Sequence, residues 1–305
     1  MISRVSRATP ETITGQAVAS FADGADARTR EILQALVRHL HAFATEVRLT
    51  EEEWRAGIGI LTATGRITDD ERQEFILWSD TLGLSMLVDA LANRPSDGAT
   101  ESTVQGPFYV QGSPLREFGA DISEQSAGTP LRVSGKVLDA SSGAPLADAE
   151  VDVWQNGDNR LYAVQDDGAP EYHLRGRFRT RADGSYSFLA VRPVPYPIPD
   201  DGPVGAMLAA AGRHPWRPAH IHVIVRSPGY RTLVTHIFDS ASDYLDSDAV
   251  FAVKPSLIRT FVEREPDDPE TPASVTGSWC SLECDFVLDA YRSSGSPASQ
   301  RSPLA

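Results

Sequence analysis

Residues 131–154 read LRVSGKVLDASSGAPLADAEVDVW, and this stretch decides the fold class. Apolar and polar residues alternate through Leu131–Leu138 and again through Ala149–Trp154, with the turn residues Ser141-Ser142-Gly143 between them. Alternation of this kind places one side of each strand in a core. The same texture predicts a hairpin over Phe178–Phe188 around Asp183-Gly184, and strands at 220–226, 233–238 and 285–289. Many short strands with turns between them indicate an antiparallel β-sandwich.

The first hundred residues carry helical periodicity instead. An apolar stripe at helical spacing, made of Ile32, Leu36, Leu40, Phe43 and Val47, predicts an amphipathic helix packed against another helix. Two Thr-x-x-Glu capping boxes, Thr50 with Glu53 and Thr68 with Glu71, predict that two further helices begin there. We therefore expect a mainly β protein with a helical domain at 1–100 and a β-sandwich domain at 101–305.

The charge balance of the 305-residue chain argues against several partners. The chain has 28 Lys and Arg against 42 Asp and Glu, and its net charge of −14 repels a nucleic acid. No apolar run approaches the roughly 18 to 20 residues of a membrane helix, and no secretory leader is recognisable. Because the chain has two cysteines, Cys280 and Cys284, we expect a reduced cytoplasmic protein with no membrane partner.

The sharpest chemical feature is a pair of histidines separated by one residue, His220-Ile221-His222. On a strand their side chains share one face, where they can bind one metal ion. Tyr162 and Tyr196 are candidate partners, because a strong Lewis acid such as ferric iron stabilises a phenolate at neutral pH. Taken alone, these residues also suit a chance pair on a surface strand with two packed aromatic rings, a zinc hydrolase, or a metal-free transthyretin-like binding module.

Five segments in this order resemble the intradiol ring-cleaving dioxygenases: Gly106-Pro107-Phe108-Tyr109, Val133–Trp154, Tyr162, the proline-rich loop around Tyr196, and Arg217–His222. The resemblance implies that one Fe(III) per subunit is bound by Tyr162, Tyr196, His220 and His222, and that Tyr196 leaves the metal when substrate arrives. It implies that Arg217 stabilises negative charge on the substrate. It also implies a homodimer joined through the N-terminal helices, with a channel there that can retain a phospholipid.

Within that family, residues 233–238 and 244–251 look most like those of the members that act on hydroxyquinol (1,2,4-trihydroxybenzene). These members use O2 to open the ring between its two adjacent hydroxylated carbons, which gives 3-hydroxy-cis,cis-muconate. Catechol and chlorocatechol are the alternative substrates. Gln105 departs from that subgroup, which tends to have an aromatic residue there. Asp80 is expected to accept a hydrogen bond from the third hydroxyl of hydroxyquinol, and His236 to position the substrate or a nearby water. The resemblance implies a pocket made of Leu77, Asp80, Val104, Gly106, Pro107, Phe108, Ile198, Pro199, Arg217, His236 and Val250.

Overall fold

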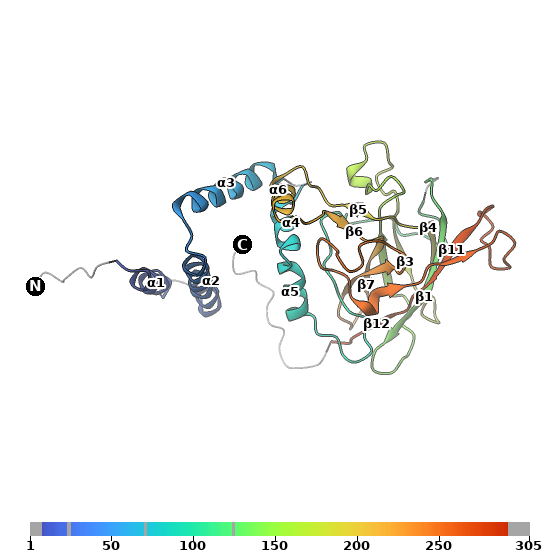
Figure 1. Ribbon diagram of the computed structural model, residues 1–305. Coiled ribbons are helices and arrows are strands. Elements are labelled where there is room, and N and C mark those ends of the chain that lie inside the picture. Colours follow the sequence, from blue (N-terminus) through green and yellow to red (C-terminus); the bar gives the residue numbers. More distant parts are fainter. Residues whose placement is uncertain (1–7, 23–25, 70–71, 124–125, 292–305) are drawn as a thin grey trace, which may run out of the picture. The chain divides into compact units, whose positions relative to one another are not determined.

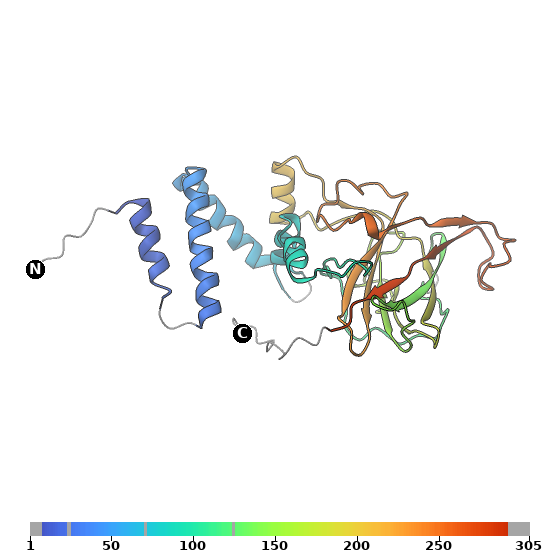
Figure 2. The ribbon, with the colours of Figure 1, turned by 90° about the horizontal axis from the view of Figure 1, so that it is seen from below.

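A computed structural model describes residues 8–22, 26–69, 72–123 and 126–291. The chain forms two compact units, and the boundary between them lies between Ala63 and Thr64. In the first unit, α1 (Pro10–Ala19) and α2 (Ala27–Glu46) lie side by side (Figure 2). Thr14 Oγ1 lies 2.9 Å from His41 Nδ1, and Gln34 donates to the Val18 carbonyl, so polar side chains join the two helices.

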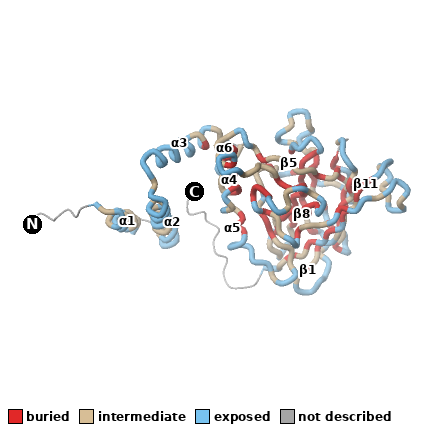
Figure 3. Tube along the Cα trace, viewed as in Figure 1, coloured by how far each residue is buried: buried red, intermediate tan, exposed pale blue. Residues whose placement is uncertain are grey.

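The amphipathic helix predicted from the apolar stripe is α2. Its first turn is capped by Asp26, whose carboxylate accepts from the amides of Arg28 and Thr29. The stripe itself is exposed within the chain, with Leu36, Leu40 and Phe43 each more than half accessible (Figure 3). The stripe is therefore an exposed apolar face among the described residues of one chain, and its expected packing against another helix stays a prediction.

The first predicted capping box is confirmed at the start of α3 (Glu51–Ile67). Thr50 Oγ1 accepts from the Glu53 amide, and the Glu53 carboxylate accepts from the Thr50 amide at 2.9 Å. The second predicted helix start, at Thr68, is wrong: the Thr68 hydroxyl donates to the Thr64 carbonyl at the end of α3, and Glu71 lies outside the described residues.

Two short helices of the second unit, α4 (Glu74–Thr81) and α5 (Leu84–Ala92), take the place of the predicted last N-terminal helix. Gly83 separates them, because its φ of +75° is a left-handed conformation that glycine adopts without strain. Among the described helices none is long and apolar enough alone to cross a membrane; α4 and α5 meet that test of length and composition together, with a bend of 76°.

The rest of the second unit is built on two five-stranded sheets that enclose a common apolar core (Figure 1). One sheet has the order β10-β11-β1-β12, with β4 also paired to β1, and the other has the order β3-β2-β7-β8-β9. The first contains β1 (Pro130–Asp139), β4 (Ser185–Val191), β10 (Val262–Arg264), β11 (Trp279–Glu283) and β12 (Phe286–Leu288). The second contains β2 (Glu150–Trp154), β3 (Arg175–Arg179), β7 (His220–Arg226), β8 (Leu233–Asp239) and β9 (Ile258–Arg259). The expected mainly β fold with a helical N-terminal region is confirmed; most pairs are antiparallel, while β1 with β11 and with β12, and β8 with β9, run parallel.

The predicted hairpin around Asp183-Gly184 is wrong in its pairing. The turn forms, since the Gly184 amide donates to the Arg181 carbonyl and the Arg181 amide to the Ser185 carbonyl. However, β3 pairs with β2 whereas β4 pairs with β1, so the turn carries the chain from one sheet to the other. A local turn signal specifies the reversal of the chain but not the strand that each arm joins.

Strand β7 separates the shared core from a second apolar cluster on the outer face of its sheet. Ile221, Val223 and Val225 point into the core between the sheets, and His220, His222 and Ile224 point the other way. The second cluster is covered by α4, α5 and the helix α6 (Pro203–Ala210), which supply Leu77, Met86 and Val204. The remaining short elements are the ribbon β5 (Tyr196–Pro197) with β6 (Trp216–Arg217) and the 3₁₀ turns η1 (Ala163–Gln165) and η2 (Pro255–Leu257).

Candidate metal centre

Three of the four predicted iron ligands converge on one point at the outer face of β7. The Nε2 atoms of His220 and His222 are 3.2 Å apart, and the hydroxyl oxygen of Tyr162 lies 3.4 Å and 3.1 Å from them, respectively. His220 and His222 share this face because side chains alternate along a strand, while Tyr162 comes from the residue before η1. All three side chains are fully buried.

Tyr196 and Arg217 complete the group from the ribbon β5-β6. The two residues are directly paired in that ribbon, and Arg217 NH1 lies 3.3 Å from both the Tyr196 hydroxyl and His220 Nε2. The Tyr196 ring meets the Tyr162 ring edge to face, with centroids 5.3 Å apart. The structure thus brings together, from four segments of the chain, every residue predicted to bind or act at the metal.

The tautomer of His220 directs a lone pair to the convergence point. Its Nδ1 lies 2.7 Å from the Pro218 carbonyl, which can only accept, so Nδ1 carries the proton and Nε2 presents a lone pair, toward which Arg217 NH1 also points. Burial lowers the pKa of both His220 and His222 well below the usual value, and the charge of Arg217 acts in the same direction. Two neutral imidazoles with Nε2 atoms this close fit a shared cation.

The phenol of Tyr162 needs a cation if it is to ionise. Burial raises its pKa well above the usual value, and the neighbouring Tyr196 adds to the effect, while Arg217 opposes it. A donor set of two imidazoles and two phenols, in which the phenols ionise only against a strong Lewis acid, fits ferric iron. The residues present therefore match the metal that the resemblance implies.

Arg217 is held by a residue that the sequence analysis did not single out. Asp248 accepts from Arg217 Nε at 3.0 Å and from NH2 at 3.4 Å, and both side chains are buried. Burial alone would lower the pKa of Arg217, but Asp248 and Tyr196 reverse this, and the resulting pKa is raised above the usual value. The guanidinium is a permanent, oriented charge beside the metal ligands.

His236 stands beside the predicted ligands as a third histidine. It is the cross-strand partner of His222, and the ligand atoms of His220, His222 and His236 all lie within 4.8 Å of one another. The Thr103 hydroxyl bonds to its Nδ1, and its Nε2 is buried with no partner among the described residues. A zinc hydrolase usually has a third histidine or a carboxylate as ligand, and His236 is a candidate for it.

A family model described as Dioxygenase matches residues 104–290, and one described as Catechol dioxygenase N terminus matches residues 26–100. The chain belongs to the intradiol dioxygenase family. Members of this family are iron enzymes, so the chain is an enzyme and the zinc hydrolase and the metal-free binding module are set aside.

Several known proteins are similar to this chain over nearly its whole length. The hydroxyquinol 1,2-dioxygenase of Nocardioides simplex is 47% identical over 289 residues, which are 94% of this chain and 98% of the relative. The 6-chlorohydroxyquinol 1,2-dioxygenase of Cupriavidus pinatubonensis is 48% identical over 91% of this chain and 96% of its own. The solved structure of hydroxyquinol 1,2-dioxygenase from Pseudomonas putida DLL-E4 is similar with a TM-score of 0.86 at 49% identity, covering 92% of this chain and 98% of that one.

The apolar residues predicted for the substrate pocket of this dioxygenase pack in one cluster with the two tyrosines: Leu77, Val104, Phe108, Ile198 and Val250. The Phe108 ring stacks on Tyr162 at 4.7 Å between centroids. A Cβ at Gly106 would lie 3.2 Å from His222 Cε1, so this residue lies directly against the imidazole, with φ of +76°. Pro107 and Pro199 are half-buried near these residues in the chain.

Asp80 is a buried carboxyl group near Arg217 and Asp248. It is 4% exposed, and burial raises its pKa, whereas a hydrogen bond from Ser85 and the charge of Arg217 oppose the rise. A buried carboxyl group requires hydrogen-bonding partners, and a hydroxyl group of a bound substrate can be one of them.

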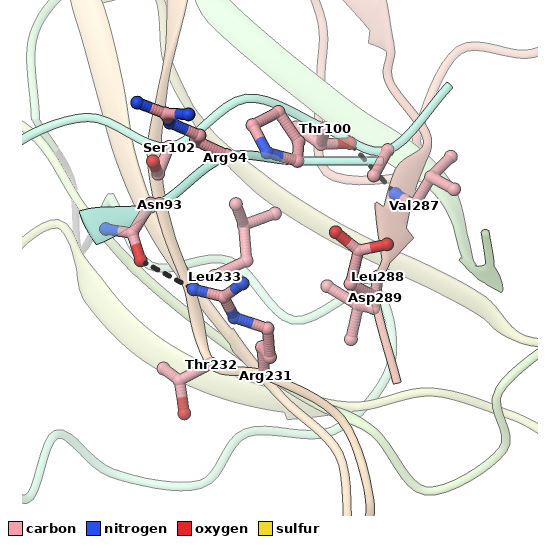
Figure 4. Close-up of a pocket in the computed structure, with 12 residues that line it drawn as sticks. Asn93, Arg94, Thr100, Ser102, Arg231, Thr232, Leu233, Val287, Leu288 and Asp289 are labelled. Atoms are coloured by element: carbon pink, nitrogen blue, oxygen red, sulfur yellow. Dashed lines mark hydrogen bonds between the residues drawn. The ribbon is translucent and has the colours of Figure 1, made fainter. Parts of the chain in front are cut away.

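A separate small cavity of about 40 Å³ lies at the end of α5, and none of the predicted site residues lines it (Figure 4). Two pairs of its polar groups bond to each other: Arg231 donates to the Asn93 side chain, and the Thr100 hydroxyl accepts from the Val287 amide. The cavity is thus distinct from the metal centre.

Proposed function

We propose that this dioxygenase cleaves hydroxyquinol with O2, opening the ring between its two adjacent hydroxylated carbons to give 3-hydroxy-cis,cis-muconate. The observation that carries the proposal is the convergence of the Tyr162 hydroxyl on the Nε2 atoms of His220 and His222 at 3.1–3.4 Å. The relatives named above for hydroxyquinol and 6-chlorohydroxyquinol support this substrate class. Catechol and chlorocatechol remain the alternative substrates, since an enzyme named catechol 1,2-dioxygenase from Candida albicans is 40% identical.

Tyr162, Tyr196, His220 and His222 are the residues proposed to hold one Fe(III) per subunit. Bound Fe(III) would act as a Lewis acid that binds the two oxygens of an ortho-diol and makes the ring reactive toward O2. Tyr196 would hold Fe(III) as a phenolate, and this phenolate oxygen is the proposed acceptor for a proton of the diol; Arg217 NH1, 3.3 Å away, would stabilise its negative charge until the proton is taken up. Arg217 is also the proposed stabiliser of negative charge that develops on the substrate.

The third hydroxyl is where hydroxyquinol differs from catechol, and Asp80 is the proposed group that recognises it. The carboxyl is buried, and the apolar side chains around Tyr162 and Tyr196 cannot accept that hydrogen bond. With catechol the carboxyl group would keep its hydrogen bond from Ser85 but receive none from the substrate, so catechol would be bound less well. We propose that His236, with its free Nε2, positions the substrate or a water instead of binding the metal.

The exposed apolar faces of the helices support the proposed homodimer. On α2 and α3 these faces include Leu36, Leu40, Phe43, Trp54 and Leu61, each more than half accessible in one chain. Apolar surface of this extent is normally covered by a partner or a ligand. We propose that residues 1–100 form the dimerisation domain, with room for a phospholipid between apolar helices, and that residues 101–305 are catalytic. Cys280 and Cys284 are both free thiols and both buried, which is compatible with the proposed cytoplasmic location.

The test is the visible spectrum of the purified protein together with its iron content, recorded before and after adding hydroxyquinol without O2. We expect a broad phenolate-to-Fe(III) band that moves to longer wavelength with substrate. A protein that stays colourless after reconstitution with Fe(III) would contradict the proposal. Binding of zinc in place of iron would favour the three-histidine site.

A further inference from the structure

The two histidines of the candidate metal centre are held in different ways. His220 is fixed by a hydrogen bond, because its Nδ1 lies 2.7 Å from the Pro218 carbonyl. A histidine that binds a metal through Nε2 is usually oriented by such a bond from its other ring nitrogen. His222 lacks one, since its Nδ1 is buried and has no hydrogen-bond partner among the described residues. A different contact therefore has to fix the plane of this imidazole.

That contact is a stack on the indole ring of Trp154. The two residues are directly paired across β2 and β7, so their side chains point to the same face of the sheet. The centroids of the indole and the His222 ring are 4.7 Å apart, and the ring planes differ by 11°. Offset stacking of this kind is a favoured arrangement of aromatic pairs. Both residues are at most 2% exposed, so the indole covers the imidazole in a site without solvent.

No other ring among the described residues lies parallel to the His222 imidazole. Three rings lie beside it but are inclined to it by 68°, 66° and 53°, namely those of His220, Tyr162 and His236. The backbone of Gly106 closes against the imidazole, because a Cβ there would lie 3.2 Å from His222 Cε1. The imidazole is thus confined by several groups, and Trp154 supplies the flat contact among them.

Trp154 makes no hydrogen bond that would explain why this position holds an indole. Its Nε1 is buried and has no partner among the described residues, although a buried indole N–H usually has one. A buried donor without a partner is unfavourable, and a phenylalanine or a leucine would avoid it. What the indole provides here is therefore its wide, flat ring.

The indole is held in its turn by Tyr109. The centroids of these two rings are 4.9 Å apart, with the planes inclined by 58°. The Tyr109 hydroxyl donates to Asp152 Oδ2 at 3.0 Å and accepts from Arg226 NH2 at 3.2 Å. Asp152 lies two residues before Trp154 on β2, and hence on the same face of the strand. Three hydrogen-bonded side chains thus anchor the ring on which His222 stacks.

We infer that Trp154 is a positioning residue of the metal centre, whose indole fixes the plane of the His222 imidazole in place of the hydrogen bond that this histidine lacks. His222 Nε2 lies 3.1 Å from the Tyr162 hydroxyl and 3.2 Å from His220 Nε2, and a turn of the ring would change both distances. A ring held in place before the metal binds loses less conformational freedom on binding. The inference rests on the proposed function, because it requires His222 to bind iron.

The test compares Trp154→Leu and Trp154→Phe with the matched control Trp279→Leu, each as the full chain. Trp279 is also 1% exposed, but it lies on β11 in the other sheet. The measurements are the Fe(III) dissociation constant, from competition with a chelator, and the EPR spectrum of the ferric protein. The melting temperature of the metal-free protein records the cost of each substitution to the fold.

For Trp154→Leu we expect the Fe(III) dissociation constant to rise about tenfold, as when a group that orients a metal ligand is removed. Its EPR lines should broaden, because the His222 ring then takes more than one orientation. Trp154→Phe, which keeps an aromatic ring, should restore both properties in large part. Trp279→Leu should lower the melting temperature as Trp154→Leu does, and leave the iron affinity and the EPR spectrum as in the natural protein.

Two results would overturn the inference. In one, Trp154→Leu lowers the melting temperature but leaves the iron affinity and the EPR spectrum unchanged, so that the indole has a structural role alone. In the other, Trp154→Phe binds iron no better than Trp154→Leu, so that ring contact is not what holds His222. If the natural protein binds no Fe(III), the proposed function itself fails, which is a separate result.

Discussion

Asp248 holds Arg217 at two points, Nε at 3.0 Å and NH2 at 3.4 Å, inside a site where neither side chain meets solvent. Asp248 is itself fixed by the amides of Val250 and Ala252. The remaining Arg217 nitrogen, NH1, is thereby directed at Tyr196 and His220. One carboxylate thus aims the cation that the reaction needs.

Asp248→Asn should disorient Arg217 and leave its charge uncompensated. We expect kcat/KM to fall about a hundredfold, and the free energy of unfolding to fall by about 3 kcal/mol, as for other buried pairs that lose one partner. Steady-state kinetics and urea unfolding measure the two effects. The exposed neighbour Asp246 provides the control as Asp246→Asn, and equal losses in both variants would contradict the role given to Asp248.

Replacing each tyrosine by phenylalanine should separate their roles. Tyr162→Phe removes the oxygen at the convergence point, so we expect much weaker iron binding and loss of most of the visible band. Tyr196→Phe should keep iron and a band from Tyr162 but slow turnover about a hundredfold, because the proton acceptor is gone. Iron content and absorption spectra of both variants decide this, and identical spectra in the two would disagree with it.

His236→Gln tests whether the third histidine binds the metal. The structure places Nδ1 against Thr103, and glutamine can keep that hydrogen bond while losing the imidazole. We expect full iron content and an unchanged band, with a raised KM for hydroxyquinol. Loss of iron would instead make His236 a ligand, and the centre a three-histidine site.

Asp80→Ala should change the choice of substrate. A hydrogen bond to a charged or buried carboxyl is worth about 1.5–3 kcal/mol, so the preference for hydroxyquinol over catechol should fall by about tenfold to a hundredfold. The ratio of the two kcat/KM values is the measurement. An unchanged ratio would remove Asp80 from substrate recognition.

The raised pKa of Asp80 also predicts a pH dependence of stability. Between the unfolded pKa of about 3.9 and the higher folded pKa, the folded state binds more protons, so the free energy of unfolding falls as pH rises through this window. Asp80→Asn lacks this effect. In urea unfolding from pH 4 to pH 8, the variant should therefore gain stability relative to the natural protein as pH rises, and a constant difference would show that the carboxyl is not destabilised by burial.

Much of this architecture could be predicted from local patterns. Strands β1, β2, β7 and β8 and the capping box at Thr50 follow from alternation and from hydrogen-bonding chemistry within a few residues. The hairpin at Asp183-Gly184 could not be predicted in the same way, because its two arms pair with strands distant in sequence. The parallel pairing of β1 with β11 and β12 could not be predicted either, because these strands are also distant in sequence.

The functional site also contains residues that could be predicted from the sequence and residues that could not. His220 and His222 are recognisable by their spacing, and Tyr162 and Tyr196 are candidates because of their phenol groups. The resemblance gave these four residues the role of iron ligands and added Arg217. Asp248 carried no signal, since an isolated aspartate in a sequence is usually a surface residue. Its importance depends on its burial and on its contact with Arg217, which exist once the chain has folded.

Both faces of strand β7 are buried from His220 to Val225. One side is committed to the core between the sheets and the other to the metal centre, so each substitution there alters folding and chemistry together. We therefore expect changes of substrate range to come from the surrounding loops and helices, such as the segment around Gln105 or helix α4, and the buried part of β7 to tolerate few substitutions.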